Sequence, residues 1–257
     1  MNEKNIEDLH TKGYTVLRNW VSEKWLSDIK NVLPRLFEEH RVIRERNNNG
    51  IKSNEVAMNV LVSDDLFINF LQEMDDRYLI NDIESHYFKG ECILNSFTAV
   101  SNIPSESSLF YKKIHRDVKV YSHPIPILLN MLVMVDDFTE ENGGTLLLPY
   151  SHLKEIKPTE EFWEENNVAV TGKAGDIIIW NSNIFHSAGS NNTEENRRGL
   201  PITFSLPYYK QLLDYPRAIG YERQSEFNLK TQRLLGYHSG VPISLEEWYR
   251  PNNTATY

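Results

Sequence analysis

A histidine and an aspartate stand two residues apart in the stretch YKKIHRDVKV, which runs from Tyr111 to Val120. The stretch alternates in the manner of a β-strand, and alternate side chains of a strand share one face. His115 and Asp117 could therefore point together at one metal ion, while Arg116 points away. Two histidines and one carboxylate form the facial ligand set that holds Fe(II) and leaves three coordination positions open. The alternative interpretation is a chance pair on a solvated strand edge.

A third ligand has to come from a distant strand, because two residues of one strand cannot enclose a metal ion. The chain offers eight histidines. His186, in NSNIFHSAGSNN, lies on a short apolar strand directly after GDIIIWN, and this position favours it. His152, in LPYSHL, is the second candidate by its chemistry alone. The remaining histidines fall in helical, connecting or terminal segments: His10, His40, His86, His123 and His238.

An arginine completes the pattern. Arg197 lies eleven residues after His186, across the polar turn SAGSNNTEEN, so a hairpin would return it beside His186. A guanidinium buried in a barrel needs an anionic partner, and a dicarboxylate supplies one through paired hydrogen bonds. The alternative is an exposed pair of Arg197 and Arg198 near Glu194 and Glu195, which would contribute little to stability.

The order of these motifs resembles the phytanoyl-CoA dioxygenase family. HRD is followed by VDDFTEENGGTLLLPYSH, by GKAGDIIIWNSNIFH and by the late arginine, and GYTVLRNWVSEKWL resembles the family's opening strand and helix. The resemblance spans most of the chain. It implies a dioxygenase with a double-stranded β-helix fold that uses Fe(II), 2-oxoglutarate and O₂. On this resemblance His115, Asp117 and His186 bind iron, and Arg197 binds the distal carboxylate of 2-oxoglutarate.

Further residues near the proposed ligands are candidates for structural or cosubstrate-binding roles. In the family's Pro-Gly-Ser-His signature Tyr150 replaces the usual glycine, and the resemblance makes His152 structural. Thr145, after the Asn-Gly turn, and Asn95, on the strand before HRD, are candidates to hydrogen-bond 2-oxoglutarate; a buried Thr or Asn bonded to backbone is the equal alternative. Related halogenases carry a small residue in place of Asp117 and bind chloride there, so the carboxylate favours hydroxylation or another oxidation.

The elements that must position these residues begin with a helical part. Tyr14–Leu17 reads as a short strand. Ser22 then precedes apolar residues at three- and four-residue spacings, which predict a helix in a unit that closes at Gly50. A second helical stretch follows Ser63. Residues 1–90 are therefore expected to be mostly helical.

From about Cys92 the pattern changes to short β-rich runs separated by turn signals such as ENGG and KAGD. These runs include CILNSFTAV, IHRDVKV, ILLNMLVMV, GTLLLP, VAV, DIIIW, IFHSA and LPITFSL. About eight short strands predict a jelly roll over 91–210. A last helix closing at Gly236 lies in 211–257. We expect a single oxygenase domain over 1–257, mainly β and cupin-like, with the N-terminal helices packed on one sheet.

Composition excludes several classes of protein. The 257 residues carry a formal net charge of −9, so nothing suggests binding to nucleic acid or to an anionic membrane. The single cysteine excludes an internal disulfide and a multi-cysteine metal site. No run approaches the roughly eighteen apolar residues of a membrane span, and the opening MNEKNIEDLH is too polar for a signal peptide. The sequence predicts a cytoplasmic enzyme with a small-molecule substrate.

Two rival functions stay open. The first is a cupin-type metal enzyme that needs no 2-oxoglutarate, either an isomerase or a dioxygenase, although Arg197 argues against it. The second is a non-enzymatic jelly roll that binds a carbohydrate or an anion and carries His-x-Asp by chance. The substrate itself is not indicated: Tyr111, Lys113 and Tyr208 are candidates to line the mouth, and none is favoured.

Overall fold

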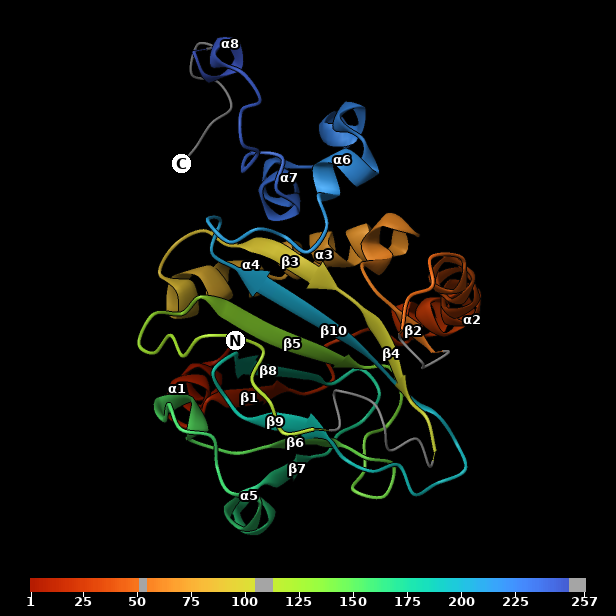
Figure 1. Cartoon of the computed structure of the whole chain (residues 1–257), viewed down its shortest axis with the longest axis vertical. Coiled ribbons are helices and arrows are strands. Elements are labelled where there is room, and N and C mark those ends of the chain that lie inside the picture. The colour runs from red at the N-terminus through yellow and green to blue at the C-terminus, as the bar shows by residue number, and fades with distance from the viewer. Residues whose placement is uncertain (51–54, 105–112, 250–257) are drawn as a thin grey trace.

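The computed structural model describes residues 1–50, 55–104 and 113–249. Within these ranges the chain forms a seven-stranded sheet and a three-stranded sheet, both antiparallel, and Figure 1 shows the smaller one beneath the larger. No helix in the described ranges has the length and apolar character needed to cross a membrane.

The larger sheet runs in the order β1-β8-β5-β10-β4-β2, and β3 pairs with β10 beside this path. Its strands are β1 (Tyr14–Leu17), β2 (Val56–Ala57), β3 (Ile93–Phe97), β4 (Ala99–Asn102), β5 (Leu128–Met134), β8 (Ile177–Asn181) and β10 (Arg197–Ser205). The smaller sheet runs β7-β6-β9, with β6 (Thr145–Leu147), β7 (Val168–Val170) and β9 (His186–Ala188).

The helices precede, connect and follow these strands. They are α1 (Glu3–Thr11), α2 (Glu23–Arg46), α3 (Leu66–Asp76), α4 (Leu79–Asp82), α5 (Glu160–Asn166), α6 (Tyr215–Ile219), α7 (Leu229–Leu235) and α8 (Leu245–Trp248). Shorter turns are 3₁₀ (Val60–Val62, Ser151–Leu153, Tyr221–Glu226) or π-helical (Ile83–Phe88).

Capping residues explain two predicted helix ends. The Ser22 side chain accepts a hydrogen bond from the Trp25 backbone amide, which satisfies a free N–H at the start of α2. Gly236 ends α7 with a φ of 91°, a left-handed conformation that glycine adopts without a Cβ clash. Both ends are confirmed. The helix α2 stops at Arg46, directly before the NNNG stretch that was predicted to close this unit at Gly50.

The larger sheet separates two hydrophobic cores, because successive side chains of each strand point to opposite faces of the sheet. On the outer face Leu129 and Met131 of β5 join the helical layer, whose members come from α1 to α4 and α7. On the inner face Leu132 and Met134 pack with Leu147 of the smaller sheet. Helices therefore cover one sheet while the other face closes the barrel, and the predicted jelly roll with helices on one sheet is confirmed.

The same alternation orients β10. Leu200, Ile202 and Phe204 belong to the outer core. The odd-numbered residues of β10, including Arg197 and Thr203, therefore face the interior between the two sheets.

The segment that carries the His-x-Asp motif is not a strand. Of IHRDVKV, only His115 makes an isolated antiparallel bridge, to His186, and bends follow it. The predicted strand is wrong here, because alternation over a few polar residues does not specify a ladder partner. Something other than sheet pairing has to fix this segment.

Candidate metal centre

Two imidazoles and one carboxylate converge inside the barrel. His115, Asp117 and His186 each offer a ligand atom, and these atoms all lie within 4.8 Å of one another. His115 Nε2 is 3.6 Å from Asp117 Oδ1, and His186 Nε2 is 3.3 Å from Asp117 Oδ2. In the described part of the chain this is the one group of three or more His, Cys, Asp or Glu side chains that could hold a metal ion.

Both imidazole rings are oriented by backbone carbonyls. Nδ1 of His115 lies 2.7 Å from the Lys113 carbonyl oxygen, and Nδ1 of His186 lies 3.1 Å from that of Ile184. With the Nδ1 proton directed at the carbonyl, Nε2 of each ring is left on the side of the Asp117 carboxylate, where it can bind a metal ion. Metal-binding histidines are commonly fixed in this way through their second nitrogen.

The chain brings the two histidines together by a local backbone contact. His115 and His186 exchange two backbone hydrogen bonds of 3.0 Å each. His186 also opens β9, where it pairs with Leu147 of β6. The first histidine is thus anchored to the second, and the second is anchored to the smaller sheet.

The carboxylate is held by a polar network on the larger sheet. Asn130 Nδ2 donates to Asp117 Oδ2 at 2.7 Å and to Ser182 Oγ at 3.0 Å, and Thr203 Oγ1 donates to Asn130 Oδ1 at 2.9 Å. Sequence reasoning missed Asn130. The available signal was its position as the lone polar residue in the apolar run ILLNMLVMV.

Burial and mutual charge set the protonation of the three groups. Burial acts to raise the pKa of Asp117, but the neighbouring His186 and His115 outweigh it and lower that pKa. Burial lowers the pKa of His186. Burial also acts to lower the pKa of His115, yet the hydrogen bond and charge of Asp117 raise it overall. At neutral pH the Asp117 carboxylate is therefore ionised and the His186 imidazole is neutral. These are the forms of the two groups that bind a divalent metal ion.

Arg197 points into the barrel, with an exposed fraction of 3%. Its Nη2 donates to the Gly143 carbonyl oxygen at 2.7 Å, and its guanidinium carbon lies 4.1 Å from the centroid of the Phe138 ring. Gly143 stands two residues before Thr145 of β6, and β6 pairs with β9. The guanidinium is thus held beside the smaller sheet that carries His186.

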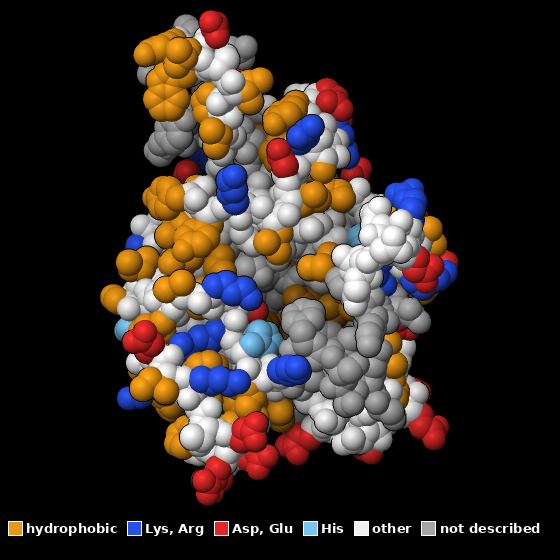
Figure 2. Space-filling view, viewed as in Figure 1, with side chains coloured by type: hydrophobic (Ala, Val, Ile, Leu, Met, Phe, Trp, Pro, Cys, Tyr) orange, Lys and Arg blue, Asp and Glu red, His pale blue; other side chains and the backbone are white. Residues whose placement is uncertain are grey.

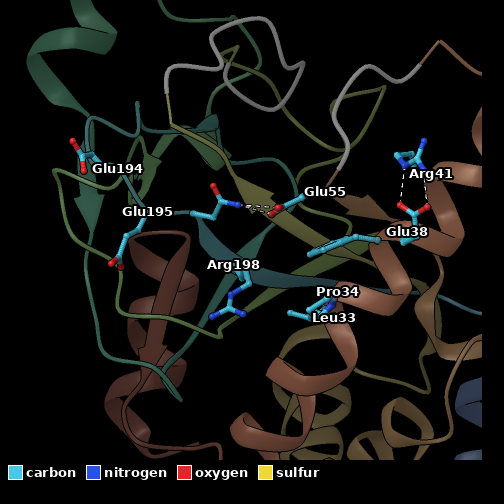
Figure 3. A pocket seen from close by; sticks show the side chains of 10 residues that line it. Leu33, Pro34, Glu38, Arg41, Glu55, Glu194, Glu195 and Arg198 are labelled. Carbon is cyan, nitrogen blue, oxygen red and sulfur yellow. Dashed lines mark hydrogen bonds and ion pairs between the residues drawn. The ribbon is translucent and has the colours of Figure 1, made fainter.

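Arg198 points the other way. Its guanidinium binds the Asp136 carboxylate through two hydrogen bonds of 2.8 Å. Figure 3 shows it in an outer groove, near Leu33 and Pro34 of α2. Two carboxylates of this groove accept hydrogen bonds from neighbouring side chains, Glu38 from Arg41 and Glu55 from Asn196 (Figure 3). The interior therefore receives Arg197 alone of this pair.

The Asn-Gly turn is packed tightly against the arginine. Asn102 of β4, which pairs with Arg197, directs its Nδ2 at the carbonyl oxygens of Gly143 and Gly189, 3.3 and 3.0 Å away. Gly143 has a φ of +77°, and a Cβ there would come within 2.4 Å of the Gly189 carbonyl oxygen. Sequence reasoning identified the turn but missed Asn102.

Two other predicted residues are buried in different parts of the structure. Thr145 is buried opposite Ala188 of β9, on the face of the smaller sheet shared with His186. Asn95 is buried on β3, where its Nδ2 donates to the Lys210 carbonyl oxygen at 3.0 Å and its own carbonyl accepts from Leu212. Asn95 thus holds the segment after β10.

His152 lies apart from the cluster. It is buried in the turn Ser151–Leu153, with Nε2 3.1 Å from the His10 carbonyl oxygen. Tyr150, at the position where the family usually has glycine, adopts a left-handed φ of 64°. The turn keeps a glycine-like backbone with a larger side chain.

The ligand cluster is accessible from the surface. The side chains of His115 and Asp117 are 27% and 33% exposed. On the face seen in Figure 2, Lys and Arg side chains gather around a histidine. Lys113 and Tyr208 are exposed, and Tyr111 lies outside the described residues.

Comparison with known proteins gives consistent findings. The family described as phytanoyl-CoA dioxygenase (PhyH) matches residues 9–199. An uncharacterised protein of Mycobacterium tuberculosis is 28% identical over 97% of this chain and 92% of its own length. A dioxygenase of Penicillium canescens is 30% identical over 51% of this chain and 46% of its own length.

Solved structures share the fold. The epimerase SnoN, in complex with Fe³⁺, alpha-ketoglutarate and nogalamycin RO, superposes with a TM-score of 0.61 at 16% sequence identity. The match covers 81% of this chain and 85% of that one.

Proposed function

Because this chain belongs to the phytanoyl-CoA dioxygenase family, we propose that it is an Fe(II)- and 2-oxoglutarate-dependent dioxygenase that hydroxylates a C–H bond of a small-molecule metabolite. Succinate and CO₂ would be the products of the cosubstrate. The convergence of His115, Asp117 and His186 inside the barrel carries the proposal. The burial of Arg197 in the same barrel interior is a second observation that supports the proposal.

The donor set fits iron. Two imidazole nitrogens and one carboxylate are the ligands of non-haem Fe(II) oxygenases, and they leave positions open for other groups. When bound, iron supplies O₂ activation coupled to the oxidative decarboxylation of 2-oxoglutarate. Asn130 holds the carboxylate of Asp117 in place during this chemistry. The retained carboxylate supports hydroxylation.

Arg197 is suited to bind the distal carboxylate of 2-oxoglutarate. Its guanidinium lies in an interior that water reaches poorly, where an ion pair is stronger than at the surface. Its fork can meet both carboxylate oxygens. The Gly143 carbonyl and the Phe138 ring fix the direction of the fork before the cosubstrate arrives.

The substrate would approach from the side on which His115 and Asp117 are exposed. A solved relative in the same fold holds a nogalamycin compound together with alpha-ketoglutarate, which supports a small organic molecule as the substrate class.

One assay tests the proposed function. Protein purified without oxygen should bind one Fe(II) per chain, and under O₂ it should convert 2-oxoglutarate to succinate slowly even without substrate. A cupin-type enzyme that needs no cosubstrate would bind metal but form no succinate. A carbohydrate- or anion-binding jelly roll would bind no iron. Either result would overturn the proposal.

A further inference from the structure

The two ligands on the His-x-Asp segment lack the support that a β-ladder would give them. His115 makes an isolated bridge, and residues 116 to 122 form bends and coil without strand pairing. His115 and Asp117 nevertheless stand within reach of His186. The residue between them explains how.

Arg116 is bound by backbone groups from two other segments. Its Nε donates to the Asn183 carbonyl oxygen at 2.6 Å, Nη1 to that of Glu155 at 2.7 Å, and Nη2 to that of Ser151 at 3.1 Å. Its guanidinium carbon also lies 3.9 Å from the centroid of the Phe185 ring. The centroid of the Tyr121 ring lies 5.0 Å from the same carbon. One side chain thus makes three hydrogen bonds and two ring contacts.

Two of these contacts fall on the segment that carries the third ligand. Asn183 and Phe185 lie within the loop between β8 and β9, just before His186. The Phe185 amide donates to Ser151 Oγ at 2.9 Å, so the turn that holds Arg116 also holds this loop. Asn183 and Ser122 exchange two further hydrogen bonds of 3.0 Å, one from the Ser122 amide and one from the Asn183 amide group.

We propose that Arg116 is a positioning residue that sets the distance between the His-x-Asp ligands and His186. The inference rests on the proposed function, in that the three side chains are taken as the metal ligands. Arginine suits this role because its planar fork donates in several fixed directions and stacks on an aromatic ring. A lysine has one ammonium group, so it cannot reach three separated carbonyls while it covers Phe185.

Metal affinity measures this role directly. Mn(II) is the probe, since it does not oxidise in air, and its dissociation constant is measured by the electron paramagnetic resonance of the free ion. Arg116→Ala should raise the dissociation constant by about 10- to 100-fold, as loss of outer-sphere support does at other metal sites. Arg116→Lys should recover part of the affinity. The control is Arg41→Lys, because Arg41 also makes several charged hydrogen bonds, to Glu38 and Glu45, but on the surface of α2.

A second readout separates positioning from general stability. At saturating Co(II), Arg116→Ala should change the shape of the visible cobalt spectrum, because the ligand geometry differs, while Arg41→Lys should leave it unchanged. Circular dichroism checks folding, and if Arg116→Ala does not fold, Arg116→Lys decides. Wild-type affinity and spectrum in the folded Arg116 variant would overturn the role of Arg116. Failure of the wild-type protein itself to bind Mn(II) would instead overturn the proposed function.

Discussion

Adjacent residues on one strand meet opposite environments in this molecule. Arg197 faces the barrel interior and donates to the Gly143 carbonyl, whereas Arg198 faces the helices and binds Asp136. The sequence alone could not fix this face, because Pro201 interrupts the alternation of GLPITFSL. The outer-core positions of Leu200 and Ile202 fix it in the structure.

The cosubstrate should therefore distinguish the two arginines. Arg197→Ala is expected to weaken 2-oxoglutarate binding at least tenfold, since removing one partner of a buried charged pair costs about 2–5 kcal/mol. Arg197→Lys should restore only part of the affinity, and Arg198→Ala should change it little. Titration of 2-oxoglutarate into anaerobic Fe(II) protein measures all three. Loss confined to the Arg198 variant would contradict the assignment.

Replacement of His186 and replacement of His152 should have different effects on metal binding and on stability. His186→Ala should abolish metal binding and leave the protein folded, because it removes one of three ligand atoms. His152→Ala should instead lower the free energy of unfolding by about 1–3 kcal/mol, because it removes a buried side chain together with its hydrogen bond to the His10 carbonyl. Metal titration and urea unfolding of both variants provide the test. Metal loss in the His152 variant alone would reverse the roles.

At the scale of elements, the Asn-Gly turn before β6 determines where the buried arginine can lie. Gly143 combines a left-handed backbone with close approach of the Gly189 carbonyl, so no side chain fits without moving backbone. Asn102 and Arg197 both donate to the Gly143 carbonyl. The turn and the arginine are therefore one packed unit.

Gly143→Ala should accordingly disturb both stability and cosubstrate binding. Alanine at a positive φ costs more than about 1 kcal/mol, and the displaced carbonyl would release the Arg197 guanidinium. Gly90→Ala is a matched control, because nothing lies within 4 Å of a Cβ at that position. Thermal unfolding and 2-oxoglutarate titration compare the variants. Equal affinity in the two variants would show that the turn does not position Arg197.

The strands and helices can be predicted where the apolar pattern is long, but less well in the segment that carries the proposed metal ligands. The β5, β8 and β10 runs and the Ser22 and Gly236 helix ends follow from local residues. The His-x-Asp segment was predicted as a strand, yet side chains rather than a ladder hold it. Asn130 and Asn102 were missed, because a buried asparagine is defined by partners that are distant in the sequence.

At the scale of the whole molecule, the outer core joins parts of the chain that were predicted separately. It contains Leu33 of α2, Met131 of β5 and Leu234 of α7, which come from the helical, barrel and C-terminal parts. From this continuity we propose that the chain folds as a single domain. Polar contacts reinforce the junction, since Asp136 after β5 binds Arg198 of β10 and also Lys30 of α2, 3.3 Å away.

This junction should make stability depend on pH. Burial acts to raise the pKa of Asp136, but Arg198 and Lys30 lower it overall. A carboxyl whose pKa is lower in the folded state stabilises the fold above its unfolded pKa, and the contribution is lost as pH falls through the folded value. Asp136→Asn should therefore lower the free energy of unfolding by about 1–2 kcal/mol at pH 7, with a difference that shrinks below about pH 4.

The neighbouring Asp137 is the control for this measurement. It lies at the surface, where it pairs with Lys173 and accepts a hydrogen bond from the Ala174 amide, and contacts of this kind contribute less there than in a buried network. Guanidinium chloride unfolding of Asp136→Asn and Asp137→Asn at pH 7 and pH 3.5 gives the comparison. An Asp136 variant whose deficit is the same at both pH values would refute the electrostatic explanation.

The indole of Trp180 gives the barrel an optical reporter of its own. Its ring centroid lies 5.4 Å from that of His186, and the side chain is packed in the inner core. An open-shell metal ion bound by His186 would quench the emission of this tryptophan by direct proximity. Trp25 belongs to the outer core and Trp20 packs against it, so their emission supplies an internal baseline. Loading of the centre can thus be followed by native fluorescence, in real time and without a label.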